Sequence, residues 1–349
     1  MKKLIYVSVL VFVSLVCISL ACILWIVTTR NSSNVVKQQG APTARASSGI
    51  VLPPGAPSEL LLKYIQLGET AFVKQILQQN PDLDVNRPRA EGNKTPIYLA
   101  CEKGYADMVK LLLKRKSDVN VCDNDGHYSA LTVAAKNGHI NVIEELLNSG
   151  IDKDARDGED RTPLYAAAAN NQPKLVEFLC KYKAKINYHR RDGWSPLTFA
   201  ANKRYAEVVD ILCKAGANVN DRYPSGDTTL LIAATWGASE IVKILIKYKA
   251  DLETCDDSRN TALIKAIMYN HEEIVDLLCQ AGANVKHPGS MSLPLQEAVY
   301  KNNKKMIKTL LKHGADPYQH AIMADRRIID EARRKCSQEI VDLLLNHRK

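Results

Sequence analysis

The sequence has few aromatic residues and lacks the short motifs that mark most catalytic sites. Phe, Trp and Tyr make up 6% of its 349 residues, and only three residues are tryptophan. We find no phosphate-binding loop, no Gly-x-Ser-x-Gly and no His-Glu-x-x-His. The run 123–126, Asp-Asn-Asp-Gly, begins like a calcium loop but lacks the acidic ligand downstream. We therefore expect a non-enzymatic protein that needs no metal and no cofactor.

Cysteine pairs at ligand spacing are also absent. The chain has nine cysteines, but no Cys-x-x-Cys and no cluster of His and Cys at zinc-binding spacing. Seven of the nine follow residue 58, an odd number that favours a reducing compartment. Cys122 and Cys255 each stand directly before an aspartate of a polar turn, and their redox state stays open.

Acidic residues are missing from the N-terminal part of the chain, which explains more than half of the net charge of +9. Five of the 47 basic residues and none of the 38 acidic residues precede Glu59. The rest of the chain therefore carries 42 basic and 38 acidic side chains, a net charge of +4. Nucleic-acid-binding domains are usually strongly basic, so we expect no nucleic-acid partner.

The sequence does contain a short patch that recurs seven times. The patches span residues 95–100, 129–134, 162–167, 195–200, 228–233, 261–266 and 293–298, and examples are Thr-Pro-Leu-Tyr-Ala-Ala and Ser-Pro-Leu-Thr-Phe-Ala. Successive patches lie 32 to 34 residues apart. A period of this length indicates a solenoid of stacked units, and such arrays mostly present binding surfaces.

Each period contains the signals of two helices and a loop. In the repeat that begins near residue 93, Thr95 and Pro96 suit the start of a helix, and Gly104 suits its end. A second helix follows with an apolar stripe, and the polar run 123–126 has the composition of a turn. The predicted fold class is an all-α repeat solenoid of helix-turn-helix-loop units.

The pattern resembles the ankyrin repeat. A Thr-Pro-Leu opening, a Val-x-x-Leu-Leu second helix and a closing Gly-Ala-Asn-Val-Asn are typical of that family, and residues 216–220 match the closing element. The resemblance covers residues 58–349. Full repeats are expected to begin near residues 93, 127, 160, 193, 226, 259 and 291, with degenerate capping units at 58–90 and 322–349. Five residues stand where the family has glycine: Asp160, Asn171, Arg204, Arg259 and Asn270.

The repeat register also predicts where three of the cysteines lie in the fold. Cys180, Cys213 and Cys279 share one position on the second helix, which leucine or isoleucine fills in other repeats. We therefore expect them to be core residues that act as small hydrophobes. Equivalent positions on stacked helices lie about 8–10 Å apart, which is too far for a disulfide.

The resemblance implies where a partner would bind. In the family, partners usually dock on the loop tips and on the exposed side of the first helix, a concave face. The candidate residues on this face are Tyr128, Arg191, Trp194, Lys203, Trp236, Met268, Tyr269 and Tyr300. Exposed aromatic residues are enriched at binding hot spots. The alternative is that Trp194 and Trp236 pack against a neighbouring repeat and have only a structural role.

The first thirty residues suggest a membrane segment. Residues 4–29 form an uncharged run of apolar and small side chains, longer than the roughly 20 residues that span a bilayer. We expect a single-pass anchor within residues 1–30 and a flexible linker over residues 31–57. A cleaved signal peptide and lipidation near Cys22 are the alternatives. Positive charges barely discriminate between the two orientations, although the short N-terminal tail slightly favours a repeat array outside the cytoplasm.

These features predict a membrane-tethered, monomeric repeat array that binds another protein. One alternative is a regulatory or inhibitory subunit of a membrane or periplasmic enzyme. Another is a secreted effector that is released, into the periplasm or beyond, by cleavage of the N-terminal segment. The sequence does not identify the partner.

Overall fold

The computed structural model describes residues 52–87, 90–120, 128–222, 226–289, 291–322 and 326–346. The predicted membrane segment, most of the predicted linker and Cys122 lie outside these residues. Within the described ranges, no helix is both long enough and apolar enough to cross a membrane.

The described residues form an all-α repeat solenoid, which confirms the predicted fold class. Its eighteen α-helices make nine consecutive pairs, and a short 3₁₀ helix, η1 (Glu91–Asn93), precedes the second pair. The first helices of the pairs are α2 (Pro57–Leu67), α4 (Pro96–Lys103), α6 (Ala130–Lys136), α8 (Pro163–Ala169), α10 (Pro196–Asn202), α12 (Thr229–Thr235), α14 (Ala262–Met268), α16 (Pro294–Tyr300) and α18 (Ile328–Lys335). The second helices are α3 (Thr70–Gln79), α5 (Ala106–Lys114), α7 (Ile140–Asn148), α9 (Pro173–Lys181), α11 (Ala206–Lys214), α13 (Ser239–Lys247), α15 (Glu272–Gln280), α17 (Lys304–Lys312) and α19 (Gln338–Leu345).

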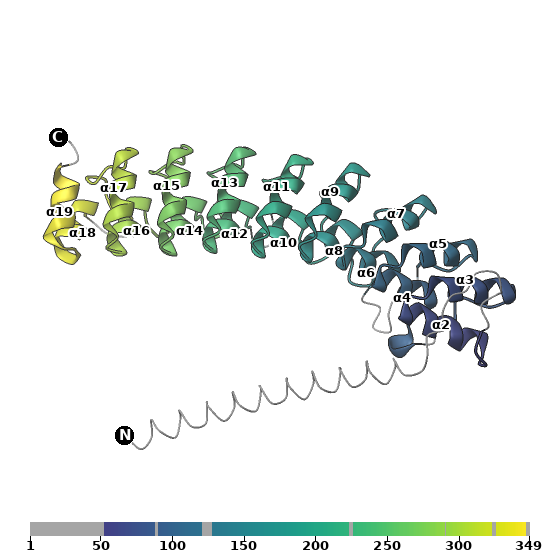
Figure 1. The fold of residues 1–349 in the computed structure, drawn as a ribbon. Coiled ribbons are helices and arrows are strands. Elements are labelled where there is room, and N and C mark those ends of the chain that lie inside the picture. The colour runs from purple at the N-terminus through teal and green to yellow at the C-terminus, as the bar shows by residue number, and fades with distance from the viewer. Residues whose placement is uncertain are drawn as a thin grey trace, which may run out of the picture. The chain divides into compact units, whose positions relative to one another are not determined.

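The pairs stack in chain order. Helix α10 contacts α11 of its own pair and the neighbouring first helices α8 and α12, while α11 contacts α9 and α13. Figure 1 shows the first helices α8 to α16 in one layer and the second helices α9 to α17 in another. The apolar residues between the two layers therefore form one continuous core from pair to pair.

Hydroxyl side chains start most of the first helices. The Oγ1 atoms of Thr95, Thr162, Thr228 and Thr261 accept the backbone N–H three residues further on. Ser129 and Ser195 do the same, and each forms a reciprocal capping box with a threonine. At the start of α16, Leu293 has no hydroxyl group, and its backbone N–H donates to Oε1 of Gln296 at 3.3 Å.

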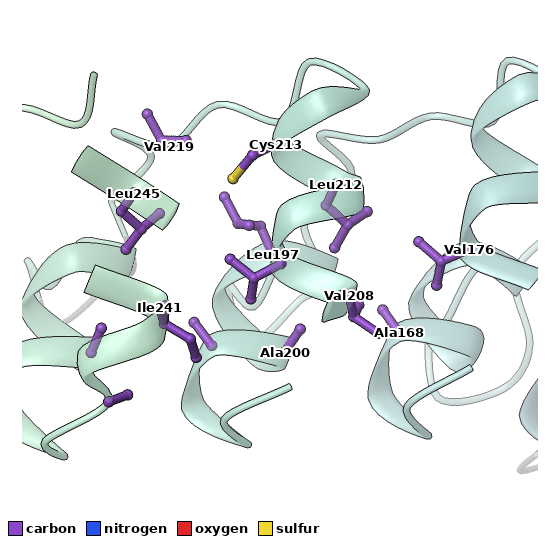
Figure 2. Packing of buried hydrophobic residues seen from close by; sticks show 14 of the residues in the cluster. Ala168, Val176, Leu197, Ala200, Val208, Leu212, Cys213, Val219, Ile241 and Leu245 are labelled. Carbon is purple, nitrogen blue, oxygen red and sulfur yellow. The ribbon is translucent and has the colours of Figure 1, made fainter. Parts of the chain in front are cut away.

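The core contains two of the three cysteines that the repeat register assigned to it, and the third packs against its edge. Cys213 and Cys279 are buried, and Figure 2 shows Cys213 in the apolar layer that holds Leu197, Val219 and Leu245. Burial raises the pKa of the Cys213 and Cys279 thiols to about 12. Cys180 lies at the edge of the core, half-buried, and burial raises its pKa to about 11. The six cysteines in the described residues are free thiols.

Side chains of one loop bind the backbone of the next loop. In each case a carboxylate or amide oxygen accepts a backbone N–H from the following repeat, about one period further along the chain. These bonds join Asn86 to Asp118 (2.7 Å), Asp154 to Lys185 (2.7 Å), Asn187 to Asn218 (2.9 Å), Asn220 to Asp251 (2.8 Å) and Glu253 to Asn284 (2.8 Å). This ladder fixes the spacing between consecutive loops.

The five residues that replace glycine keep the left-handed backbone that glycine would adopt. Their φ values are 61° at Asp160, 54° at Asn171, 63° at Arg204, 58° at Arg259 and 62° at Asn270. Side chains are disfavoured in this region, least so for Asn and Asp. The turns therefore retain their shape without glycine, at a cost in conformational energy.

Candidate functional site

Large apolar side chains are exposed where the first helices α12, α14 and α16 begin or end. Trp236 caps the C-terminus of α12, Met268 and Tyr269 stand at the end of α14, Tyr300 ends α16, and Met291 precedes it. The exposed fraction is 54% for Trp236, 52% for Tyr269 and 67% for Met291. We refer to these five residues as the apolar surface.

The repeat register explains why these side chains gather. Trp236 and Tyr269 occupy one position of the period, and Met268 and Tyr300 occupy the position before it. Helix α14 contacts both α12 and α16, so equivalent positions on these helices are neighbours (Figure 1). Contiguous exposed apolar side chains of this kind mark interaction sites more often than scattered ones do.

Polar contacts from neighbouring repeats hold this surface in place. The Arg204 guanidinium donates to the carbonyl oxygen of Trp236. The Nε2 atom of His271 lies 3.1 Å from the carbonyl oxygen of Thr235, and the His271 ring lies 6.4 Å from the Tyr269 ring in a nearly parallel arrangement. Side chains of the repeats on either side therefore hold the backbone at Thr235 and Trp236 in place.

A groove of about 500 Å³ opens beside α14 and α16. Met268, Met291, Tyr300 and Ile322 contribute its apolar side chains. The Gln296 amide group donates to the Tyr300 hydroxyl and to the carbonyl oxygen of Ile322, each at 3.1 Å. It also accepts the Ile322 backbone N–H at 2.9 Å. The amide thus joins α16 to the loop before α18 and fixes the groove wall.

One carboxylate lines this groove. The Oε2 atom of Glu297 accepts a hydrogen bond from the Ser292 hydroxyl at 3.0 Å. Its Oε1 atom lies 3.9 Å from the Nζ atom of Lys301, which is longer than a hydrogen bond. The Glu297 side chain is 18% exposed, so a bound group could reach it.

A partly buried ion pair stabilises the turn before α14. Asp256 lies 2.7 Å from the Nζ atom of Lys265 and accepts the backbone N–H of Asn260 at 2.8 Å. Burial by itself would raise the pKa of Asp256, but the bonds from Lys265 and Asn260 outweigh it and hold the pKa below its ordinary value. The carboxylate therefore stays charged and keeps the turn in place.

The other four predicted residues lie on a different part of the array, near α6, α8 and α10. The Trp194 ring is half-buried and packs edge-on against Phe199 at 5.8 Å. Arg191 and Lys203 are exposed, and the Lys203 Nζ atom lies 5.6 Å from the Phe199 ring centre. Trp194 thus has a packing contact within its own repeat, whereas the Trp236 ring is mostly exposed.

Tyr128 is enclosed by cations. The Arg161 guanidinium lies 3.7 Å from the centre of its ring, and the Lys136 Nζ atom lies 4.3 Å from it. Arg161 is itself buried and lies 2.9 Å from Asp157. Tyr128 therefore forms a cation–π cluster with residues of its own chain, and its ring is not an open binding surface.

Of the groove residues, sequence reasoning predicted Met268 and Tyr300 and missed the others, among them Met291, Gln296 and Glu297. Met291 stands in the turn position that Gly193 and Gly226 occupy in earlier repeats. A large apolar residue at a turn position where other repeats have glycine could have been recognised in the sequence as a candidate surface residue. Gln296 stands where other repeats have the threonine of the capping box. Its role in the groove depends on contacts with the loop that precedes α18, and no local sequence pattern predicts these contacts.

The described residues include exposed apolar side chains but no cluster of metal ligands and no thiol with a lowered pKa. Within these ranges, no three His, Cys, Asp or Glu side chains lie close enough to hold a metal ion. Burial raises the pKa of each of the six described thiols, so these thiols are protonated at neutral pH and are poor nucleophiles.

Comparison with known protein families agrees with the repeat geometry. A model described as ankyrin repeats (three copies) matches residues 61–157, 153–223 and 216–288, and a single ankyrin-repeat model matches residues 292–321. The matches cover well over half of the chain. The protein therefore belongs to the ankyrin-repeat family, whose repeats are generally non-enzymatic modules for protein–protein interaction.

The chain is similar to parts of several characterised proteins. It is 30% identical to the potassium channel AKT2/3 of Arabidopsis thaliana over 39% of this chain and 20% of the channel. It is 32% identical to the probable 26S proteasome regulatory subunit p28 of Saccharomyces cerevisiae over 29% of this chain and 45% of that subunit. It is 29% identical to the human ankyrin repeat domain-containing protein 63 over 37% of this chain and 35% of that protein. The matched region thus spans less than half of each relative.

Proposed function

We propose that this protein is a non-enzymatic interaction module that binds a partner protein on the apolar surface. The observation that carries the proposal is the exposure of Trp236, Met268, Tyr269, Met291 and Tyr300 on consecutive repeats. Trp, Tyr and Met are enriched in the cores of protein interfaces, and Trp and Tyr are frequent hot spots. A partner that covers these side chains would remove apolar area from water.

Binding would need little rearrangement of the array. Arg204 and His271 contact the backbone carbonyl oxygens of Trp236 and Thr235, and the His271 ring lies beside the exposed Tyr269 ring. A surface that is already ordered loses less conformational entropy when a partner binds. The proposed mechanism is therefore presentation of a preformed surface.

Affinity capture with the full chain tests this proposal. We compare the wild type with a Trp236→Ala/Tyr269→Ala variant and with Tyr182→Ala. Tyr182 is a matched control because it is also an exposed aromatic residue, at the end of the second helix α9 and away from the apolar surface. A partner should be recovered by the wild type and by Tyr182→Ala, and lost from the double variant. Equal recovery by all three proteins would contradict the proposal.

We also propose that residues 4–29 anchor the array in a membrane. The support is the length of the uncharged apolar run. The full chain should remain in the membrane fraction after carbonate extraction, and N-terminal sequencing should find residue 1 or 2. A mature N-terminus between residues 22 and 30 in a protein that leaves the membrane fraction would instead indicate a secreted protein. Protease added to intact cells or spheroplasts should digest the array if it lies outside the cytoplasm, the orientation that we favour.

A further inference from the structure

We infer that the groove beside α14 and α16 binds a lysine or arginine side chain of the partner, with the cationic group at Glu297. The methylene stem of that side chain would lie between Met268, Met291 and Tyr300. The inference rests on the proposed function and names the chemistry of the partner segment that the apolar surface would hold.

The groove walls suit a long aliphatic stem. Two flexible thioether side chains, Met268 and Met291, and the Tyr300 ring face a volume of about 500 Å³. Methionine adapts its shape to an irregular ligand, and the stems of lysine and arginine bury readily along apolar surface while their charged ends seek polar partners. A side chain of this shape can use both the walls and the carboxylate.

The carboxylate of Glu297 has unused acceptor capacity. An ionised carboxylate offers about four acceptor positions, and the contact that meets hydrogen-bond distance here is the one from Ser292 at 3.0 Å. The Lys301 Nζ atom, at 3.9 Å from Oε1, is an intrahelical neighbour without a hydrogen bond. A cation from a partner could therefore add a charge-assisted hydrogen bond, which is stronger than a neutral one.

Other cations near the groove have carboxylate partners of their own. Lys265 on α14 lies 2.7 Å from Asp256. Lys335 on α18 lies 3.4 Å from Glu331 and 4.5 Å from the centre of the Tyr300 ring. These pairs leave Glu297 as the carboxylate that lines the groove and lacks a cation at hydrogen-bond distance.

The Glu297 carboxylate also disfavours binding of uncharged apolar or acidic side chains in the groove. An uncharged apolar side chain in the groove would cover Glu297 and remove water from it without supplying a counter-charge. An acidic side chain would place a second negative charge beside it. Complementarity of charge and of apolar shape together thus select lysine or arginine.

Methyl NMR of the full chain in detergent solution tests the inference. The chain has six methionines, and ¹³C-methyl labels on Met268 and Met291 report directly on the groove. Met108 and Met306 are buried and serve as internal controls for the fold. The probes are acetyl-Gly-X-Gly-amide peptides in which X is lysine, arginine, norleucine or glutamate, because norleucine keeps the stem of lysine without its charge.

The wild type should bind the lysine and arginine peptides about tenfold more tightly than the norleucine peptide, because a charge-assisted bond adds on the order of 1.4 kcal/mol. Glu297→Gln should remove this preference. Glu240→Gln is the matched control, because it removes one negative charge from an exposed site on α13, and it should keep the preference.

Equal affinity of the wild type for lysine and norleucine, a preference for glutamate, or an unchanged preference in Glu297→Gln would overturn the inference. Absence of any shift at Met268 and Met291 would overturn it as well. In each of these cases, recovery of a partner by the wild type and its loss from the Trp236→Ala/Tyr269→Ala variant in the capture experiment would still support the proposed function, so the two failures can be told apart.

Discussion

At the scale of single residues, exposure separates two tryptophans that the repeat pattern placed on one face. The Trp236 ring is mostly exposed, whereas the Trp194 ring packs against Phe199. The sequence places both residues at the edge of a repeat, but the neighbours that cover a ring come from the folded chain. The different exposure of Trp194 and Trp236, and therefore their different roles, could not be predicted from their positions in the repeat alone.

This difference predicts opposite effects of two alanine substitutions. Trp236→Ala should lower partner recovery and change the free energy of unfolding by less than about 1 kcal/mol, because few contacts are lost. Trp194→Ala should destabilise the array by about 2 kcal/mol, because it removes an aromatic pair and leaves space beside Phe199. Chemical denaturation of both variants measures these effects. A larger loss of stability in Trp236→Ala than in Trp194→Ala would contradict this assignment.

A second residue-scale prediction concerns Gly104, which ends α4 at φ 83°. A Cβ atom there would lie 2.6 Å from the Nδ1 atom of His139, whereas one at Gly150, with φ 89°, would meet nothing within 4 Å. Gly150→Ala should cost about 1 kcal/mol of stability from backbone strain alone. Gly104→Ala should cost at least about 1 kcal/mol more because of the clash.

A double-mutant cycle separates the two causes of this loss. In a His139→Ala background the clash is removed, so Gly104→Ala should then cost about as much as Gly150→Ala. Denaturant unfolding of the four proteins measures the coupling. Identical costs of Gly104→Ala in both backgrounds would show that His139 does not restrict this turn.

At the scale of the elements, the starts of the six first helices α4 to α14 could be predicted well from the sequence. A hydroxyl residue followed by proline or a small residue marks these starts, and Thr162 and Ser195 form the expected caps. The groove could not be predicted in this way. It depends on Gln296, whose amide group binds a carbonyl oxygen 26 residues away along the chain. Contacts between repeats of this kind have no local signature.

The turn before α14 predicts a dependence of stability on pH. The pKa of Asp256 in the folded array lies below the ordinary value of 3.8. A depressed carboxylate pKa contributes stability that is complete above the unfolded pKa and is lost as the pH falls through the folded pKa. The wild type should therefore be more stable than Asp256→Asn by a constant amount above about pH 5.

Below pH 3.8 that advantage should shrink. Thermal unfolding of both proteins between pH 7 and pH 3 is the measurement, and a stability difference that does not change across this range would exclude the ion pair as its source. Partner recovery by the two variants at neutral pH then shows whether the turn also positions the apolar surface.

At the scale of the whole molecule, stacked repeats convert a period in the sequence into a continuous surface. Residues one period apart become neighbours because α12, α14 and α16 contact one another in order. The resemblance to ankyrin repeats implied which face of each repeat a partner would use, and the period placed four of the five residues of the apolar surface, all except Met291, on that face. The period could not predict that exposed residues gather on three consecutive repeats, since this depends on what covers each side chain.

Site-specific photocrosslinking tests the central proposal most directly. Benzoylphenylalanine is placed, in separate full-length proteins, at the position of Trp236, of Tyr269 or of Tyr182, and the cells that produce the protein are irradiated. The account predicts a protein adduct of one common mass from positions 236 and 269 and none from position 182. Adducts from position 182 alone, or none from positions 236 and 269, would contradict it.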